Sequence, residues 1–149
     1  MALFPRGSAQ TTNSSIHVVY SPTCPHCHAL MSYLEEKGVK FDRTQDGREA
    51  ARVLLRNGID WKGGVPVMYT VVNGTVYAVE GFPAGSQLKD GYFLGREREE
   101  ELCSEMGGKP YHYNGSYRFC KLPNGMFLGN VYSVDYVVGQ AKAFLPHSD

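Results

Sequence analysis

The chain has 149 residues, of which 15 are basic and 15 acidic, so its formal net charge is zero. This length is enough to bury the core of one domain with a small appendage. The neutral balance argues against a nucleic-acid-binding protein, and no apolar run reaches the roughly 18 residues that a membrane-spanning helix needs.

Residues 1–15 are predicted to be a tag remnant or a disordered tail, because Pro5-Arg6-Gly7-Ser8 is similar to the scar of a cleaved tag. A native secretion signal would have been removed with them. The four cysteines form an even set, which suits an oxidising compartment. We expect an extracytoplasmic protein, periplasmic or secreted, with a cytoplasmic location as the alternative.

The first structural elements are a strand and a helix. The β-rich run Ile16–Tyr20 predicts the strand, and the helix is predicted to end before Gly38. Apolar side chains recur at the i, i+3, i+4 and i+7 positions of one helix face: Cys27, Leu30, Met31 and Leu34. Cys27 is therefore expected to face inward.

The motif Cys24-Pro25-His26-Cys27 lies where the strand gives way to the helix. A sulfur at a helix start meets unpaired N–H groups and the positive end of the helix dipole, which lowers the pKa of the Cys24 thiol. Pro25 suits the first helical position. Because the thiolate is the attacking species in disulfide exchange, we predict Cys24 as the exposed nucleophile and Cys27 as the resolving thiol.

His26 lies between the two cysteines and is predicted to donate a hydrogen bond or a positive charge to the Cys24 sulfur. Stabilising the reduced form in this way makes the disulfide more oxidising. His28 is expected to be a surface residue.

The same residues allow three other interpretations. Cys24 to His28 spell Cys-x-x-Cys-His, the attachment signature of c-type haem. Zinc is a second alternative, with Cys24, Cys27, His26 and His28 as donors, although no second ligand pair follows. An unreactive structural disulfide is the third, but a loop this short restricts the unfolded chain little.

A second strand is predicted at Val39–Phe41, and Asp46 with Glu49 forms a start signal for a second helix. The buried stripe of that helix is predicted to be Ala50, Val53 and Leu54. Strand, helix and strand in this order require a right-handed crossover and a parallel pair.

A hairpin follows, because Pro66–Val72 and Thr75–Glu80 flank the turn signal Asn73-Gly74. Its antiparallel strands complete a predicted α/β fold with a mixed four-stranded sheet flanked by helices.

Cys-Pro-His-Cys after the first strand and Gly64-Val65-Pro66 before the third resemble the thioredoxin superfamily over about residues 16–82. The compact layout resembles a glutaredoxin, and the Pro-His dipeptide resembles the bacterial Dsb oxidases. The resemblance implies that Pro66 is cis and lies against the dithiol. Substrate is expected to bind in extended form beside it, at Val65, Gly64, Trp61 and Tyr20.

The chain departs from the thioredoxin pattern at Val18, where thioredoxins carry a buried carboxylate. This departure weakens the interpretation as a reductase, but glutaredoxins also lack that carboxylate. A glutathione-dependent enzyme would need basic residues near the dithiol, and Lys62 and Arg43 are the candidates.

We divide the chain into a thioredoxin-fold core at 16–95 and a C-terminal β-hairpin and helix extension at 96–149 that packs on it. Arg96–Met106 is predicted to be a polar helix with a solvated acidic face. A β-meander with turns at Asn114-Gly115 and Asn124-Gly125 is predicted next, built from Tyr111, Tyr113, Tyr117, Phe119, Phe127 and Val131. Ser133 is expected to cap a last helix that carries Val134, Val137, Val138, Ala141 and Leu145.

Cys103 and Cys120 are predicted to form a structural disulfide whose loop of about 18 residues stabilises the fold by roughly 3 kcal/mol. The alternative is a second redox pair that exchanges electrons with Cys27.

The sequence therefore predicts a monomeric thiol-disulfide oxidoreductase that forms or isomerises protein disulfides through Cys24 and Cys27, without a cofactor or a metal. Its expected partners are protein thiols or disulfides and a redox partner protein, for example a membrane oxidoreductase. The alternatives are a glutaredoxin-like reductase and a metal- or haem-binding protein that uses Cys24, Cys27 and His28.

Overall fold

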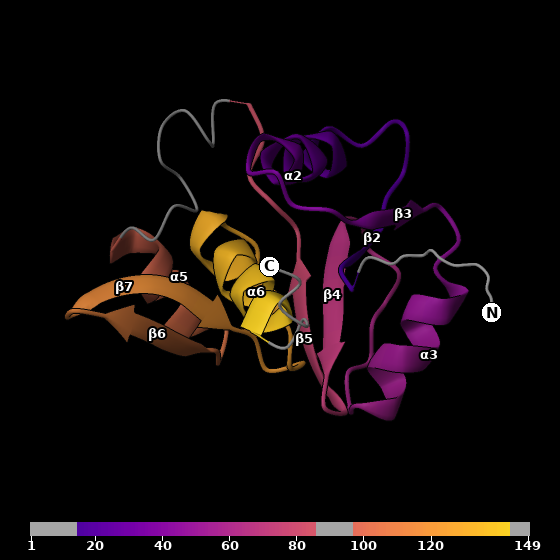
Figure 1. Ribbon diagram of the computed structural model, residues 1–149. Coiled ribbons are helices and arrows are strands. Elements are labelled where there is room, and N and C mark those ends of the chain that lie inside the picture. Colours follow the sequence, from indigo (N-terminus) through magenta and orange to yellow (C-terminus); the bar gives the residue numbers. More distant parts are fainter. Residues whose placement is uncertain (1–14, 86–96, 144–149) are drawn as a thin grey trace.

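The structure is a computed structural model that describes residues 15–85 and 97–143 (Figure 1). The predictions for the tail at 1–14, for Arg96 and for Leu145 lie outside these residues. The strands are β2 (His17–Val19), β3 (Asp42–Thr44), β4 (Val67–Val72), β5 (Thr75–Glu80), β6 (Lys109–Tyr113), β7 (Ser116–Lys121) and β8 (Phe127–Leu128). The helices are α2 (Pro25–Glu36), α3 (Arg48–Arg56), α5 (Glu97–Glu105) and α6 (Val131–Ala143).

The described strands form one mixed sheet of seven strands in the order β3-β2-β4-β5-β8-β7-β6. β2 pairs with β3 in parallel and with β4 in antiparallel fashion, which confirms the predicted parallel pair and the mixed α/β class. The predicted four-stranded sheet was too small. β8 pairs in parallel with the free edge of β5, so the C-terminal strands extend the first sheet. Edge strands are commonly covered in this way.

Two apolar layers cover the two faces of the sheet. Val18, Met68 and Val79 point to the face that α2 and α6 cover. Their neighbours Val19, Val67 and Ala78 point to the opposite face, where Ala50 and Leu54 of α3 pack. This alternation follows from the two-residue period of a strand. Figure 1 shows α3 and α6 on either side of the β4–β5 hairpin.

The second strand lies later than predicted, at β3 (Asp42–Thr44) instead of Val39–Phe41. Val39 and Phe41 do pack against the core, but the Val39 N–H still bonds the Leu34 carbonyl beyond the end of α2. Pairing with β2 starts at Asp42, whose N–H donates to the Ile16 carbonyl. The apolar residues Val39 and Phe41 therefore show where the chain packs against the core and not where the strand pairs. The paired residues of β3 are exposed.

The predicted Asn-Gly turns have different outcomes. Asn73 and Asn114 adopt φ of 51° and 53°, and each is followed by a glycine with positive φ, which confirms both two-residue hairpin turns. Asn124-Gly125 is not such a turn, because it lies in a longer connection from β7 to β8. One predicted member of the meander differs, since Val131 begins α6. Tyr113 lies in β6 as predicted and is 64% exposed.

The last helix starts three residues earlier than Ser133 suggests. Asn130 Oδ1 accepts the Ser133 N–H at 2.8 Å, and Ser133 Oγ accepts the Asn130 N–H at 2.9 Å, so the two residues cap the helix reciprocally. As predicted, α6 packs on the sheet, against β4, β5 and β7. The acidic helix is not wholly solvated, because Glu99 is only 3% exposed and accepts hydrogen bonds from the Asn130 amide.

Candidate functional site

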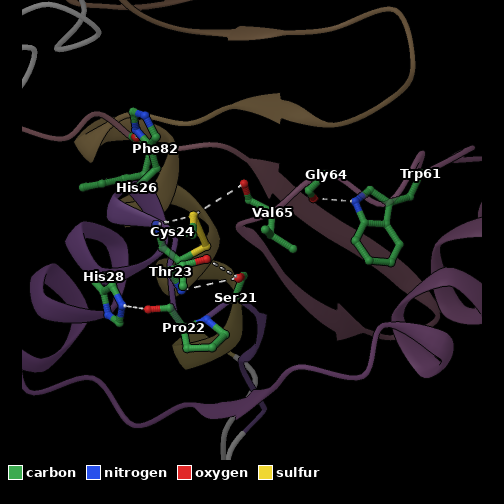
Figure 2. Close-up of a disulfide and its surroundings, with 11 residues drawn as sticks. Ser21, Pro22, Thr23, Cys24, His26, His28, Trp61, Gly64, Val65 and Phe82 are labelled. Carbon is green, nitrogen blue, oxygen red and sulfur yellow. Dashed lines mark hydrogen bonds between the residues drawn. A yellow bond between two sulfur atoms is a disulfide. The ribbon is translucent and has the colours of Figure 1, made fainter.

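Cys24 is the N-cap residue of α2, in an extended conformation with φ of −102° and ψ of 107°. Its Sγ accepts the backbone N–H of Cys27 at 3.1 Å, so the sulfur takes the place that a Ser or Asp oxygen fills in other caps. Pro25 occupies the first helical turn, as predicted. Cys24 and Cys27 are joined by a disulfide with a Cα–Cα distance of 5.2 Å (Figure 2).

The two sulfurs of this disulfide differ in exposure. Cys27 is fully buried on the face of α2 that packs on the sheet, whereas Cys24 is half-buried. An incoming thiolate can therefore approach Cys24 and not Cys27. The helix start also presents its free N–H groups to the Cys24 sulfur, which favours a thiolate there after reduction.

The loop before β4 lies against this sulfur. The Val65–Pro66 peptide bond is cis, and the Val65 carbonyl oxygen is 3.9 Å from Cys24 Sγ. The Pro66 carbonyl accepts the Gly81 N–H at 2.9 Å, which ties the loop to the end of β5. On the far side of the loop, the Trp61 indole N–H donates to the Gly64 carbonyl at 2.9 Å (Figure 2).

The two histidines of the motif bond backbone carbonyl groups. His26 Nδ1 lies 2.7 Å from the Phe82 carbonyl oxygen, and His28 Nε2 lies 2.7 Å from the Pro22 carbonyl oxygen. Nδ1 of His26 is therefore not the donor to Cys24 that the sequence suggested. An influence of the His26 charge on that sulfur stays a prediction. His28 is exposed, as expected.

Two hollows flank the Val65–Pro66 loop. The first hollow, of about 300 Å³, is bounded by His26, the loop, Phe82, and the junction of β8 with α6 at Leu128 and Gly129. The second hollow, of about 280 Å³, lies toward Trp61 and Lys62 and is closed by Asn124 and Met126. Glu80 and Gly81 border both hollows. The disulfide therefore adjoins a surface with room for a ligand on each side of the loop.

Most of the predicted site residues come together. His26 and Pro66 line the first hollow, and Val65, Gly64 and Trp61 line the second. Cys24 lies against the loop between them through the Val65 carbonyl, and Cys27 is buried beneath it. Tyr20 stands apart, because it packs against the core and lines neither hollow.

Sequence reasoning missed the contribution of the C-terminal strands to this site. Asn124, Leu128 and Gly129, which lie in or next to β8 and its connection to β7, border the hollows. Glu80 and Phe82, at the end of β5, border them as well. A signal for one of them exists in retrospect. A Cβ on Gly129 would lie 1.8 Å from the Gly81 carbonyl oxygen, so the glycine permits the close approach of β8 to β5.

Cys103 and Cys120 form the second disulfide, with an S–S distance of 2.05 Å and a Cα–Cα distance of 5.8 Å. The bond joins α5 to β7, and neither residue has any exposed surface. Gly108 lies directly against both sulfurs, at 2.6 and 3.0 Å from the position of a Cβ. The pairing is the predicted one, and it lies outside both hollows.

The residues on which the metal-binding and reductase alternatives depend do not form one site. Within 15–85 and 97–143, no group of three or more His, Cys, Asp or Glu residues is arranged to hold a metal ion. Val18 is fully buried in the layer that holds Cys27. Lys62 lines the second hollow and pairs with Asp60, whereas Arg43 pairs with Glu35 on the exposed side of β3.

No helix in the described part of the chain is both long enough and apolar enough to cross a membrane. The chain matches no protein family, no curated protein and no solved structure.

Proposed function

We propose that this protein is a thiol-disulfide oxidoreductase of the thioredoxin superfamily, with Cys24 and Cys27 as its redox-active pair. The order β3-β2-β4-β5, with α2 and α6 on one face and α3 on the other, supports the resemblance that the sequence motifs suggested. The Val65–Pro66 loop lies against the Cys24 sulfur, which agrees with the position that the resemblance implies for it.

The observation that carries the proposal is the unequal setting of the two sulfurs. Cys24 is half-buried and accepts a backbone N–H at the start of α2, while Cys27 is fully buried. Disulfide exchange needs an attackable sulfur that is also a good leaving thiolate, and a second thiol poised to displace it. This pair offers both within one helical turn.

In the oxidising direction, a substrate thiolate attacks Cys24 Sγ and forms a mixed disulfide. The Cys24–Cys27 bond breaks, and its electron pair goes to the Cys27 sulfur, which takes up a proton. A second substrate thiolate then attacks the substrate sulfur, forms the substrate disulfide and releases the Cys24 thiolate. The substrate loses two electrons and two protons. The Cys24–Cys27 pair gains both electrons and one proton, which is on Cys27, and the second proton goes to the solvent.

We favour the oxidising or isomerising direction because the Cys27 N–H and the start of α2 stabilise a thiolate at Cys24. Stabilising the reduced form raises the potential, and each 1.4 kcal/mol corresponds to about 30 mV. The substrates are then protein thiols or disulfides in an extracytoplasmic compartment. A redox partner protein with a more oxidising disulfide returns Cys24 and Cys27 to the disulfide form.

One observation favours the alternative of a glutathione-linked reductase. Lys62 lines the second hollow, where a basic group could receive a glutathione carboxylate. This alternative predicts that reduced glutathione recycles the protein during turnover, and that Lys62→Gln slows the recycling step.

Trapping of the mixed disulfide tests the proposed function. A Cys27→Ser variant is mixed with a cysteine peptide that carries an activated disulfide, and adducts are identified by mass spectrometry after acid quenching. We expect a stable adduct at Cys24, because the resolving thiol is missing. The matched Cys24→Ser variant should form little adduct. Equal adducts on both variants would contradict the proposed roles.

A further inference from the structure

The second hollow lies on the other side of the Val65–Pro66 loop from the disulfide. Figure 2 shows Cys24 and Trp61 on opposite sides of Val65. The walls of this hollow include an indole, a carboxylate and an amide, contributed by Trp61, Glu80 and Asn124. Its opening is therefore polar and aromatic, although it adjoins an apolar layer.

Glu80 is held in place by the connection between β7 and β8. The Asn124 side-chain amide donates to Glu80 Oε1 at 2.9 Å, and Asn124 Oδ1 accepts the Met126 N–H at 2.9 Å. Among the described residues, Glu80 Oε2 has no hydrogen-bond partner, and no basic side chain pairs with this carboxylate. One carboxylate oxygen is thus left to bind a ligand.

The lining of the second hollow holds two charged side chains, Lys62 and Glu80. Lys62 is the one basic residue of its lining, and its ammonium group pairs with Asp60. Glu80 adds a negative charge that this pair does not neutralise. A cation is therefore the ligand whose charge complements the hollow.

Trp61 supplies a fixed aromatic surface at the same place. Its indole N–H is bound to the Gly64 carbonyl, and its ring packs so closely on Gly47 that a Cβ there would lie 2.6 Å from the ring. An indole held this way loses little entropy when a guanidinium or ammonium group stacks on it.

We propose that the second hollow is a specificity subsite for an Arg or Lys side chain directly beside the reactive cysteine of the substrate. The inference rests on the proposed function. Successive side chains of an extended segment point in opposite directions. When the substrate cysteine reaches Cys24 on one side of the loop, its neighbour points to the other side, toward Trp61 and Glu80.

The test measures how fast the oxidised protein reacts with short thiol peptides. The core sequences are Gly-Cys-Arg-Gly and Gly-Cys-Gln-Gly, with Gly-Cys-Gly-Arg as a control that shifts the charge to the opposite side. Each rate is divided by the rate of the same peptide with a small aromatic disulfide, which removes differences in thiol acidity. We expect the first peptide to react about threefold to tenfold faster than the other two at low salt.

The Glu80→Gln variant keeps the shape of the side chain and removes its charge, so the advantage of the arginine peptide should disappear. Glu36→Gln is the matched control, because Glu36 is exposed at the far end of α2 and should keep the advantage. Equal rates of the three peptides, or an undiminished advantage in Glu80→Gln, would overturn the subsite and leave the proposed function standing. If no peptide forms a mixed disulfide with the protein, the proposed function fails and the subsite fails with it.

Discussion

The two disulfides of this chain have the same covalent chemistry in opposite settings. Cys24–Cys27 has a sequence separation of three at a helix start, and its half-buried Cys24 lies against the Val65–Pro66 loop that lines two hollows. Cys103–Cys120 spans 17 residues, joins a helix to a strand, and has no exposed surface. The first closes a loop too short to restrict the unfolded chain much, and the second closes a long one. Sequence separation and exposure therefore favour the proposed reactivity of the first and the predicted structural role of the second.

The largest difference should appear in stability. Replacing Cys103 and Cys120 together by Ala should lower the free energy of unfolding by about 3 kcal/mol, because the closed loop of the unfolded chain is released. Replacing Cys24 and Cys27 together by Ala should cost at most about 2 kcal/mol on the same entropy argument. Denaturant unfolding of both double variants checks the order. A larger loss for the Cys24 pair would invert the assignment.

The second-largest change in stability is expected where β8 pairs with β5 and joins the two parts of the sheet. Gly129→Ala should destabilise the protein by about 2 kcal/mol, because its Cβ would overlap the Gly81 carbonyl and force β8 away from β5. Gly139→Ala is the matched control. Its Cβ meets no atom within 4 Å in the exposed face of α6, so it should stabilise the helix by about 0.5–1 kcal/mol. Thermal unfolding of the two variants should shift in opposite directions, and equal shifts would refute this reading of the junction.

The third prediction concerns His26, between the two cysteines of the first disulfide. His26→Ala should lower the reduction potential of the Cys24 pair by an amount on the order of 30 mV, equivalent to about 1.4 kcal/mol of lost thiolate stabilisation. His28→Ala should leave the potential unchanged, since the exposed His28 ring bonds the Pro22 carbonyl. Equilibration in glutathione buffers measures both variants. A potential that does not move in His26→Ala would assign that histidine to Phe82 alone.

The smallest effect concerns the buried region around the second disulfide. Tyr117 packs with Cys103 and Cys120, and its hydroxyl has no hydrogen-bond partner within the described residues. Tyr117→Phe should therefore stabilise the protein by about 1 kcal/mol at pH 7. Burial raises the pKa of the Tyr117 hydroxyl, and the nearby Glu99 and Glu100 raise it further.

The sign of the pH dependence follows from that shift. An acid whose pKa is raised by folding keeps its proton in the folded state, so the wild type loses stability as the pH rises above 10, the ordinary tyrosine pKa. The advantage of Tyr117→Phe should grow above pH 10, as measured by urea unfolding at pH 7 and pH 10.5. An advantage that stays constant or shrinks would contradict the burial argument.

The sequence predicted correctly those features that depend on residues close together in the chain. The i, i+3, i+4, i+7 face of α2 and the positive φ of Asn73 and Asn114 depend on near neighbours, and the structure contains all of them. The parallel pairing of β8 with β5 was not predicted, because β8 has two residues and its partner is far away in sequence. A strand of two residues is too short to show an alternating pattern in the sequence.

The candidate site divides in the same way. The motif and its resemblance predicted the Cys24–Cys27 pair, the cis bond before Pro66 and the place of Trp61 beside the loop. Asn124 and Gly129 were not, because β7 and β8 bring them to the loop only when β8 pairs with β5. Glu80 was predicted as the end of a strand but not as a site residue. The helix cap at Asn130 was missed for a related reason. Asn130 and Ser133 are equally good caps by residue type, and only the start of α6 distinguishes them.

The central claim is that the first disulfide exchanges and the second does not. Equilibration of the protein across a series of dithiol buffers, followed by differential alkylation and mass spectrometry of each cysteine, measures both potentials in one sample. We predict that Cys24 and Cys27 become reduced together at a potential of about −200 mV or higher, while Cys103 and Cys120 stay oxidised to below about −300 mV. Reduction of both pairs over the same range, or of the Cys103 pair first, would contradict the account.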